Sequence, residues 1–172
     1  MALLKIIHAP DSVLKKKCLA VERVDDEVRR LMDDMLETMY AAPGIGLAAP
    51  QVAVHRRVIV VDAADPRTEP KPLRMANPET VWASDELAVR EEGCLSFPDQ
   101  FAEVNRPARV RVRFLDHENE MREIEAEGML ATCIQHEMDH LDGVLFVDRI
   151  SMLKRNIILR KMTKLRKAAV DG

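Results

Sequence analysis

His136-Glu137-Met138-Asp139-His140 is the stretch of this 172-residue chain on which the interpretation of the rest depends. Residues four apart lie on one face of an α-helix, so the imidazoles of His136 and His140 can converge on one metal ion. Glu137 adjoins the first histidine, where its carboxylate can take a proton from water that a metal activates. The pattern therefore predicts a metal-binding helix. The alternative is an exposed helix that carries two histidines by chance.

A third ligand has to come from elsewhere, because catalytic sites of the zinc type have three protein ligands and leave one position for water. No Glu follows Glu137 and no His or Cys follows His140, so the two familiar downstream completions of H-E-x-x-H are missing. Unless Asp142 or Asp148 serves, the ligand lies upstream. Besides many carboxylates, the upstream candidates are His8, Cys18, His55, Cys94 and His117.

Cys94 stands out among these candidates because of its surroundings. Gly93 lets the backbone turn closely before it, and Pro98 stiffens the chain after it. A thiolate is a good ligand for a borderline or soft divalent metal. Position alone does not decide between this role and the ordinary one of a lone cysteine, which is that of a small buried residue.

Length and charge limit the kinds of function. We expect residues 1–172 to form a single catalytic domain that ends in a basic helix at 151–172. A formal net charge of −3 gives no general attraction to DNA. The chain has no signal-peptide pattern at its start and no apolar run of about 18 residues, so we expect a cytoplasmic protein without a membrane partner.

Three segments carry apolar residues at the i, i+3, i+4 spacing of amphipathic helices. They are Asp25 to about Ala42, the stretch that follows Gly128 and runs through Leu141, and a final helix with Ser151 as its N-cap. Gly143 can cap the second helix in a left-handed conformation, and Ser151 is a good N-cap for the third. The apolar residues of the third helix are Leu153, Ile157, Ile158, Met162 and Leu165.

Other segments have the composition or the period-two alternation of β-strands. They are Arg57–Ala63, Val81–Arg90, Arg109–Leu115 and Met121–Glu127. A turn at Asp116–Asn119 joins the last two into a hairpin with one wet face. Because helices and strands do not alternate regularly, we expect an α+β fold. Its mixed, mostly antiparallel strands would pack around the central H-E-x-x-H helix, with the amphipathic helix at the C-terminus.

Three motifs, taken together, resemble those of the peptide deformylases. Gly44–Gln51 reads G-I-G-L-A-A-P-Q, Glu92–Ser96 reads E-G-C-L-S, and Gln135–Gly143 reads Q-H-E-M-D-H-L-D-G. They occur in the family's order, the resemblance covers essentially the whole chain, and the E-G-C-L-S form is similar to that of bacterial enzymes. The resemblance implies hydrolysis of the formyl group from the N-terminal formylmethionine of newly made chains, with release of formate.

The resemblance also implies the residues of the site. The ligands of one divalent metal ion would be Cys94, His136 and His140. Glu137 would be the general acid and base, and Gln51 with the backbone N–H of Leu95 would form the oxyanion hole. The resemblance favours Fe2+ as the physiological ion, although Zn2+, Ni2+ or Co2+ also suits two histidines and a cysteine.

Helical spacing places further residues near the predicted metal. Met129 and Cys133 fall on the same helix stripe as His136, so we expect them, together with Ile45, to line a pocket for the methionine side chain of the substrate. The alternative is that they belong to the ordinary core. Gly46 lets a substrate backbone approach closely. Ligand histidines usually have an outer hydrogen-bond partner, and the nearest candidates in sequence are Glu92, Gln135 and Asp139.

Between Lys154 and Lys167 the chain has seven basic residues and no acidic one. The ordinary interpretation of such a run is a solvated helix face. Some bacterial deformylases are thought to dock on the ribosome through their C-terminal helix, so the resemblance implies a contact of 151–167 with ribosomal RNA.

Two other functions compete with deformylation. A metallopeptidase that cuts internal bonds is disfavoured because the downstream ligand is missing. A binding protein with a structural metal is disfavoured because structural sites usually have four protein ligands, whereas this chain offers three ligands and a carboxylate suited to base catalysis.

Overall fold

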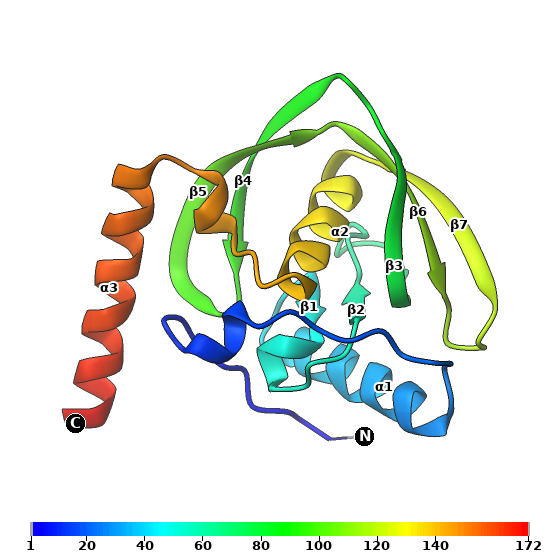
Figure 1. Ribbon diagram of the computed structural model, residues 1–172, viewed down its shortest axis with the longest axis horizontal. Coiled ribbons are helices and arrows are strands. Elements are labelled where there is room, and N and C mark those ends of the chain that lie inside the picture. Colours follow the sequence, from blue (N-terminus) through cyan, green and yellow to red (C-terminus); the bar gives the residue numbers. More distant parts are fainter. Residues whose placement is uncertain (1, 172) are drawn as a thin grey trace.

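The helix with the H-E-x-x-H pattern, α2 (Gly128–Leu141), lies at the centre of the computed structural model, which describes residues 2–171. Figure 1 shows two sheets around it, with α1 (Asp26–Ala41) below the larger sheet and α3 (Met152–Asp171) at the opposite side of the molecule. The predicted α+β class is therefore confirmed, including the central helix and the C-terminal helix.

The larger sheet has five antiparallel strands in the order β1-β2-β3-β6-β7, and the smaller has two, β4 and β5. The strands of the larger sheet are β1 (Gly46–Ala48), β2 (Val58–Val61), β3 (Leu73–Ala83), β6 (Arg109–Leu115) and β7 (Met121–Glu127). Those of the smaller are β4 (Leu87–Cys94) and β5 (Phe97–Pro107). Short 3-10 helices connect these elements at Ser12–Lys15, Ala49–Val52 and Phe146–Arg149.

The apolar run of β2 is explained by burial of both its faces. Ile59 and Val61 pack in the core on the side of α2, and Val58 and Val60 pack in the core on the side of α1. Successive side chains of a strand point to opposite faces, so a strand between two helices needs an uninterrupted apolar run. The larger sheet is thereby held between α1 and α2.

The predicted helix from Asp25 to about Ala42 is confirmed as α1. The Asp25 carboxylate caps it by accepting a hydrogen bond from the Val28 N–H at 3.0 Å. The side chains that face the sheet recur at helical spacing, and Met32, Met35 and Met39 are fully buried. With few aromatic residues in the chain, unbranched methionines fill this side of the core.

The predicted hairpin at 109–127 is also confirmed, and β6 and β7 pair from Arg109 with Glu127 to Leu115 with Met121. Val110, Val112 and Phe114 point into the core, whereas the opposite face pairs arginines of β6 with glutamates of β7. Arg111 faces Glu125 in this ladder. These charged side chains favour exposure of the edge strand β7 to water and oppose its pairing with a strand of another chain.

The predicted strand Val81–Arg90 is wrong, because the chain turns inside it. β3 ends at Ala83 and β4 begins at Leu87. Ser84 stabilises the turn, since its hydroxyl donates to the Glu86 carbonyl at 2.8 Å and accepts from the Arg109 N–H at 3.0 Å. The strand β5 that follows was not predicted at all.

The C-terminal helix α3 begins after Ser151, whose hydroxyl accepts a hydrogen bond from the Lys154 N–H at 3.2 Å, as the sequence predicts. Only part of its apolar face packs against the rest of the protein. Ile158 and Met162 are buried, but Leu153 is 72% exposed. Figure 1 shows α3 projecting along one side of the molecule. Within residues 2–171, no helix combines the length and the hydrophobicity needed to cross a membrane.

Two glycines at the ends of α2 have positive φ and differ in what surrounds them. Gly143 has a φ of 74°, and an added Cβ would lie 2.7 Å from the carbonyl carbon of Lys15. Gly128 has a φ of 62°, and the nearest atom to an added Cβ is 3.9 Å away, in the Arg90 side chain. Gly143 therefore both caps the helix and lets the N-terminal segment pass close to it.

Substitution of these glycines tests that distinction. Gly128→Ala should lower the free energy of unfolding by about 1–2 kcal/mol, because it introduces left-handed strain alone. Gly143→Ala should lower it by at least about 1 kcal/mol more, because the methyl group also overlaps the Lys15 backbone. Urea denaturation of both variants measures the difference. Equal losses would mean that the Lys15 segment moves aside freely.

Candidate metal centre and its cavity

The structure brings Cys94, His136 and His140 together, although 46 residues separate the cysteine from the second histidine. Their ligand atoms all lie within 4.8 Å of one another, and Cys94 Sγ is 3.4 Å from His140 Nε2. Both histidines are buried. Within the described residues, this is the one group of three His, Cys, Asp or Glu side chains with such spacing. The other upstream candidates lie outside it.

Cys94 is placed by a tight hairpin. It ends β4 and pairs with Phe97, so Leu95 and Ser96 form a two-residue turn. In such a turn, the N–H of the first turn residue takes no part in the hairpin's own hydrogen bonds. The Leu95 N–H therefore makes no hydrogen bond within the hairpin and lies next to Cys94, where it can donate to another group. An added Cβ on Gly93 would lie 2.6 Å from the Phe101 ring, so the close packing of the hairpin there requires glycine.

His136 is oriented by Glu92, whose Oε1 accepts a hydrogen bond from Nδ1 at 2.9 Å. This bond leaves Nε2 as the nitrogen available to a metal. Burial raises the pKa of Glu92, but hydrogen bonds from His136 and Arg106 outweigh that effect and hold the pKa below its ordinary value. Glu92 therefore remains an anion, which is the form that accepts from both neighbours.

Arg106 completes this arrangement and is almost fully buried. It donates to both carboxylate oxygens of Glu92, at 2.6 and 2.9 Å, and to Asp139 Oδ2 at 2.9 Å. Asp139 also accepts from Arg149. Of the three candidates for orienting the ligand histidines, only Glu92 contacts one, since the Gln135 amide donates to backbone carbonyls instead.

Glu137 lies beside the three candidate ligands with one oxygen unused. It is buried, and its Oε1 has no hydrogen-bond partner. Burial raises its pKa to about 7, whereas a nearby cation would favour the ionised form. A buried polar atom without a partner calls for an explanation. A sulfur and two imidazole nitrogens next to such a carboxylate suit a divalent transition metal, so the residues fit the predicted ion.

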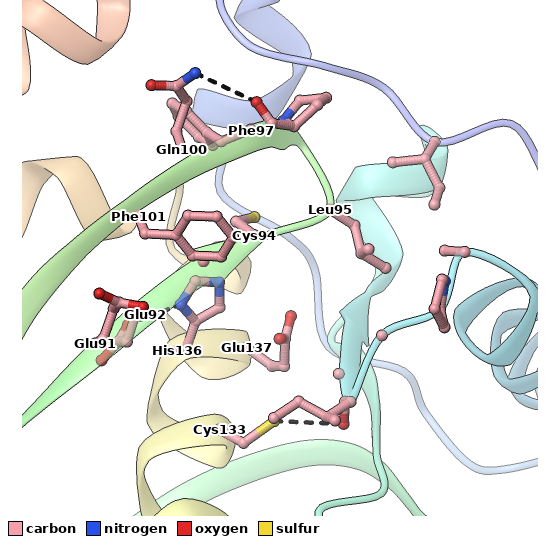
Figure 2. Close-up of a pocket in the computed structure, with 18 of the residues that line it drawn as sticks. Glu91, Glu92, Cys94, Leu95, Phe97, Gln100, Phe101, Cys133, His136 and Glu137 are labelled. Carbon is pink, nitrogen blue, oxygen red and sulfur yellow. Dashed lines mark hydrogen bonds and ion pairs between the residues drawn. The ribbon is translucent and has the colours of Figure 1, made fainter.

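A cavity of about 640 Å³ opens beside this group. Figure 2 shows the Glu137 carboxylate projecting from α2 into it, with Cys94 and Leu95 on the hairpin above and the Phe101 ring near His136. Among residues 2–171, no Lys or Arg side chain lines the cavity. Its walls include the residues predicted for substrate, namely Ile45, Gly46, Met129 and Cys133.

These wall residues differ in burial. Ile45 and Met129 are 46% and 44% exposed, so the ordinary-core alternative does not describe them. Cys133 is buried, and its thiol donates to the Ile45 carbonyl oxygen at 3.4 Å. Burial, assisted by the charge of Glu137, holds the pKa of Cys133 well above its ordinary value, so this thiol stays neutral.

Gly46 was expected to make room for a substrate backbone, but its nearest neighbours are side chains of α2. An added Cβ would contact Glu137 Oε2 and lie 2.8 Å from Cys133 Sγ. The missing side chain therefore leaves room for the Glu137 carboxylate as well as for a substrate.

Gln51 is buried but does not line the cavity. Its Oε1 accepts from the Ala48 N–H at 2.9 Å, and its Nε2 donates to Ser96 Oγ at 3.0 Å. The same Nε2 lies 3.5 Å from Cys94 Sγ. The amide is thus directed at the candidate metal ligands rather than at open solvent.

The sequence did not point to Arg106, Ser96 or Phe101 as members of the site. A signal for Arg106 exists in retrospect, because it follows Val104 at strand spacing and both face inward. An arginine at an inward strand position needs a buried carboxylate partner. Phe101 is 61% exposed at the cavity rim, which no sequence pattern distinguishes from a surface residue.

Comparison with known proteins identifies the group to which this chain belongs. The model of the polypeptide deformylase family matches residues 3–156. A peptide deformylase from Phenylobacterium zucineum is 56% identical over 169 residues, which cover 98% of this chain and 100% of the relative. The crystal structure of peptide deformylase from Ehrlichia chaffeensis is 38% identical, covers 98% of this chain and 99% of that one, and has a TM-score of 0.92.

A second crystal structure from Ehrlichia chaffeensis contains peptide deformylase in complex with actinonin. It is 41% identical, covers 95% of this chain and 98% of that one, and has a TM-score of 0.91. These matches span the hairpin, the central helix and the cavity between them. The chain therefore belongs to the polypeptide deformylase family, whose members are metal-dependent enzymes that remove the N-formyl group from newly made polypeptides.

Proposed function

We propose that deformylation takes place here at a divalent metal ion held by Cys94, His136 and His140. The observation that carries the proposal is the meeting of these three ligand atoms, within 4.8 Å of one another, at a cavity that Glu137 also lines. When bound, such an ion lowers the pKa of a coordinated water from about 15.7 toward about 7, which supplies a nucleophile near neutral pH. The same proposal treats residues 1–172 as one catalytic domain.

Glu137 is the general acid and base of this proposal. Its unpartnered Oε1 accepts the proton that water loses as the new C–O bond forms at the formyl carbon. The same carboxyl returns the proton to the amine nitrogen as the C–N bond breaks. Formate and a free N-terminal amine are the products, so no other reactant is needed.

The Leu95 N–H and the Gln51 amide stabilise the negative charge that develops on the formyl oxygen. The Leu95 N–H is free of the hairpin's hydrogen bonds, and Gln51 has a second N–H besides the one given to Ser96. This second N–H is directed toward Cys94 Sγ, so a small rotation brings it to a substrate oxygen in the same space. One such donor is worth about 3 kcal/mol in other enzymes.

The cavity accepts the methionine side chain of the substrate between Ile45, Met129 and Cys133. These side chains are apolar or neutral, and among the described residues no Lys or Arg lines the cavity. Fe2+ is the physiological metal in this proposal, and purified protein can hold Zn2+, Ni2+ or Co2+ in its place.

Formate release from a formyl-Met dipeptide by anaerobically prepared protein tests the function. Glu137→Gln should lower kcat by about 10²–10⁴-fold, because an amide cannot take the proton. Metal content, measured on the same sample, should not change. Actinonin, which the Ehrlichia chaffeensis relative binds, should block release by the unaltered protein. A Glu137→Gln protein with full turnover would refute the assigned role.

Gly46→Ala tests whether the room beside Glu137 matters. The added methyl group would displace the Glu137 carboxylate and also overlap Cys133 Sγ, so a modest loss of stability should accompany the loss of activity. Displacement by about 1 Å should lower kcat by about 10- to 100-fold. Thermal unfolding and metal content serve as controls. An unchanged kcat would show that the carboxylate has space to spare.

A ribosome contact through 151–167 belongs to the same proposal, together with a cytoplasmic location where nascent chains emerge. Of the seven basic side chains in this helix, the structure pairs Arg155 with Asp148 at 3.0 Å. Lys161, Lys164 and Lys167 are exposed on α3. Exposed cations on a projecting helix favour contact with phosphate groups.

Two triple variants with the same change in net charge test the contact. The helix variant replaces Lys161, Lys164 and Lys167 by Gln. The control variant replaces the exposed residues Lys15, Lys16 and Lys17 by Gln. The helix variant alone should sediment less with ribosomes in low salt, and the salt slope should fall by about 1 for each phosphate group that the helix no longer binds. Equal sedimentation of the two variants would contradict a specific role of the helix.

A further inference from the structure

Tyr40 and Asp62 form a hydrogen bond that links the end of α1 to the residue after β2, next to a segment that lines the cavity. Tyr40 lies in the last turn of α1, and Asp62 directly follows β2. The Tyr40 hydroxyl donates to Asp62 Oδ2 at 2.6 Å. The phenol ring is 43% exposed, whereas Asp62 is only 7% exposed, so the carboxylate is the inner partner.

The Asp62 carboxylate accepts hydrogen bonds from three neutral donors. Besides the Tyr40 hydroxyl, it accepts from the Ala64 N–H and the Lys71 N–H, each at 3.1 Å. Its own backbone N–H donates to the Ile45 carbonyl at 2.8 Å. Asp62 thus connects the end of α1, the loop after β2 and the segment that carries Ile45. A buried carboxylate with these donors has few other positions available to it.

The segment from Ala42 to Gly46 forms one wall of the cavity. Backbone hydrogen bonds hold it at both ends, because the Gly44 N–H donates to the Met39 carbonyl at 2.7 Å and Ile45 accepts from Asp62. The Ile45 side chain is half-exposed, so packing contributes little to its position. The position of this wall therefore depends on hydrogen bonds. Tyr40 fixes the Asp62 side chain, and the Asp62 backbone holds Ile45.

We propose that Tyr40 and Asp62 are positioning residues that hold the Ile45 wall of the cavity and so set the preference for the methionine side chain. The inference rests on the proposed function, which places that side chain against Ile45. Neither residue lines the cavity, so their effect is exerted through the backbone of 42–46.

Tyr40→Phe removes one hydroxyl and keeps the ring. KM for formyl-Met-Ala should rise by about 3- to 10-fold, which corresponds to the loss of one hydrogen bond of ordinary strength, while kcat changes less than about 2-fold. For formyl-Ala-Ala, whose side chain does not reach Ile45, kcat/KM should change less than about 2-fold. Asp65→Asn is the matched control, because Asp65 lies in the same loop and its carboxylate contacts Arg67 rather than 42–46.

The hydrogen bond itself has a spectroscopic readout, because Tyr40 is the only tyrosine of the chain. Burial, followed by the hydrogen bond to Asp62 and the charge of Asp62, raises the pKa of Tyr40 to about 12. Phenolate absorbance in an alkaline titration should therefore appear about two pH units above the ordinary value of about 10. Asp62→Asn should bring the pKa back toward that value and repeat the KM effect, which keeps the test open if Tyr40→Phe folds poorly.

The outcomes separate two kinds of failure. Without formate release by the unaltered protein, the proposed function fails. If the unaltered protein is active but Tyr40→Phe and Asp62→Asn leave the KM for formyl-Met-Ala unchanged, the positioning role alone fails. Equal losses on the two dipeptides would also refute it, because a purely structural role would not distinguish the side chains.

Discussion

The hydrogen bond between Glu92 and the His136 ring joins the two parts of the molecule on which the site depends. Glu92 belongs to β4 and His136 to α2. Arg106 of β5 donates hydrogen bonds to the same carboxylate. These groups are buried, and a buried charge that loses its partner costs about 3–5 kcal/mol, so each member requires the others. The requirement keeps Cys94, two residues beyond Glu92, beside the histidines of the helix.

The two walls of the cavity are held by different forces. Met129 and Cys133 stand on α2, whose inner face is packed in the core against the larger sheet. Ile45 lies in the short connection before β1. Its carbonyl oxygen accepts hydrogen bonds from the Asp62 N–H and the Cys133 thiol. Packing makes the first wall rigid, whereas the second depends on a few hydrogen bonds. Under the proposed function, selection of the substrate side chain is therefore more sensitive to substitutions on the Ile45 side of the cavity.

Local sequence predicted those elements whose signals lie within one segment. α1, α2 and the β6–β7 hairpin follow from apolar periodicity, the acidic cap of α1 and a turn between two alternating strands. β5 was missed because Arg106 occupies an inward position where alternation demands an apolar residue. Amphipathic spacing predicted α3, but such spacing does not say how much of a helix packs against a neighbour, and Leu153 is exposed.

By itself, the sequence determined that a helix with two histidines and an adjacent glutamate would sit among antiparallel strands, because helical and strand periodicities are local properties. Spacing left five upstream His and Cys residues, besides carboxylates, as candidates for the third ligand, and the motif resemblance selected Cys94 among them. Only the tertiary structure decided that its sulfur lies 3.4 Å from His140 Nε2, that Glu92 is the partner of His136, and that Gln51 points at the ligands. Contacts between segments 40 or more residues apart depend on how sheets and helices pack, which no local pattern contains.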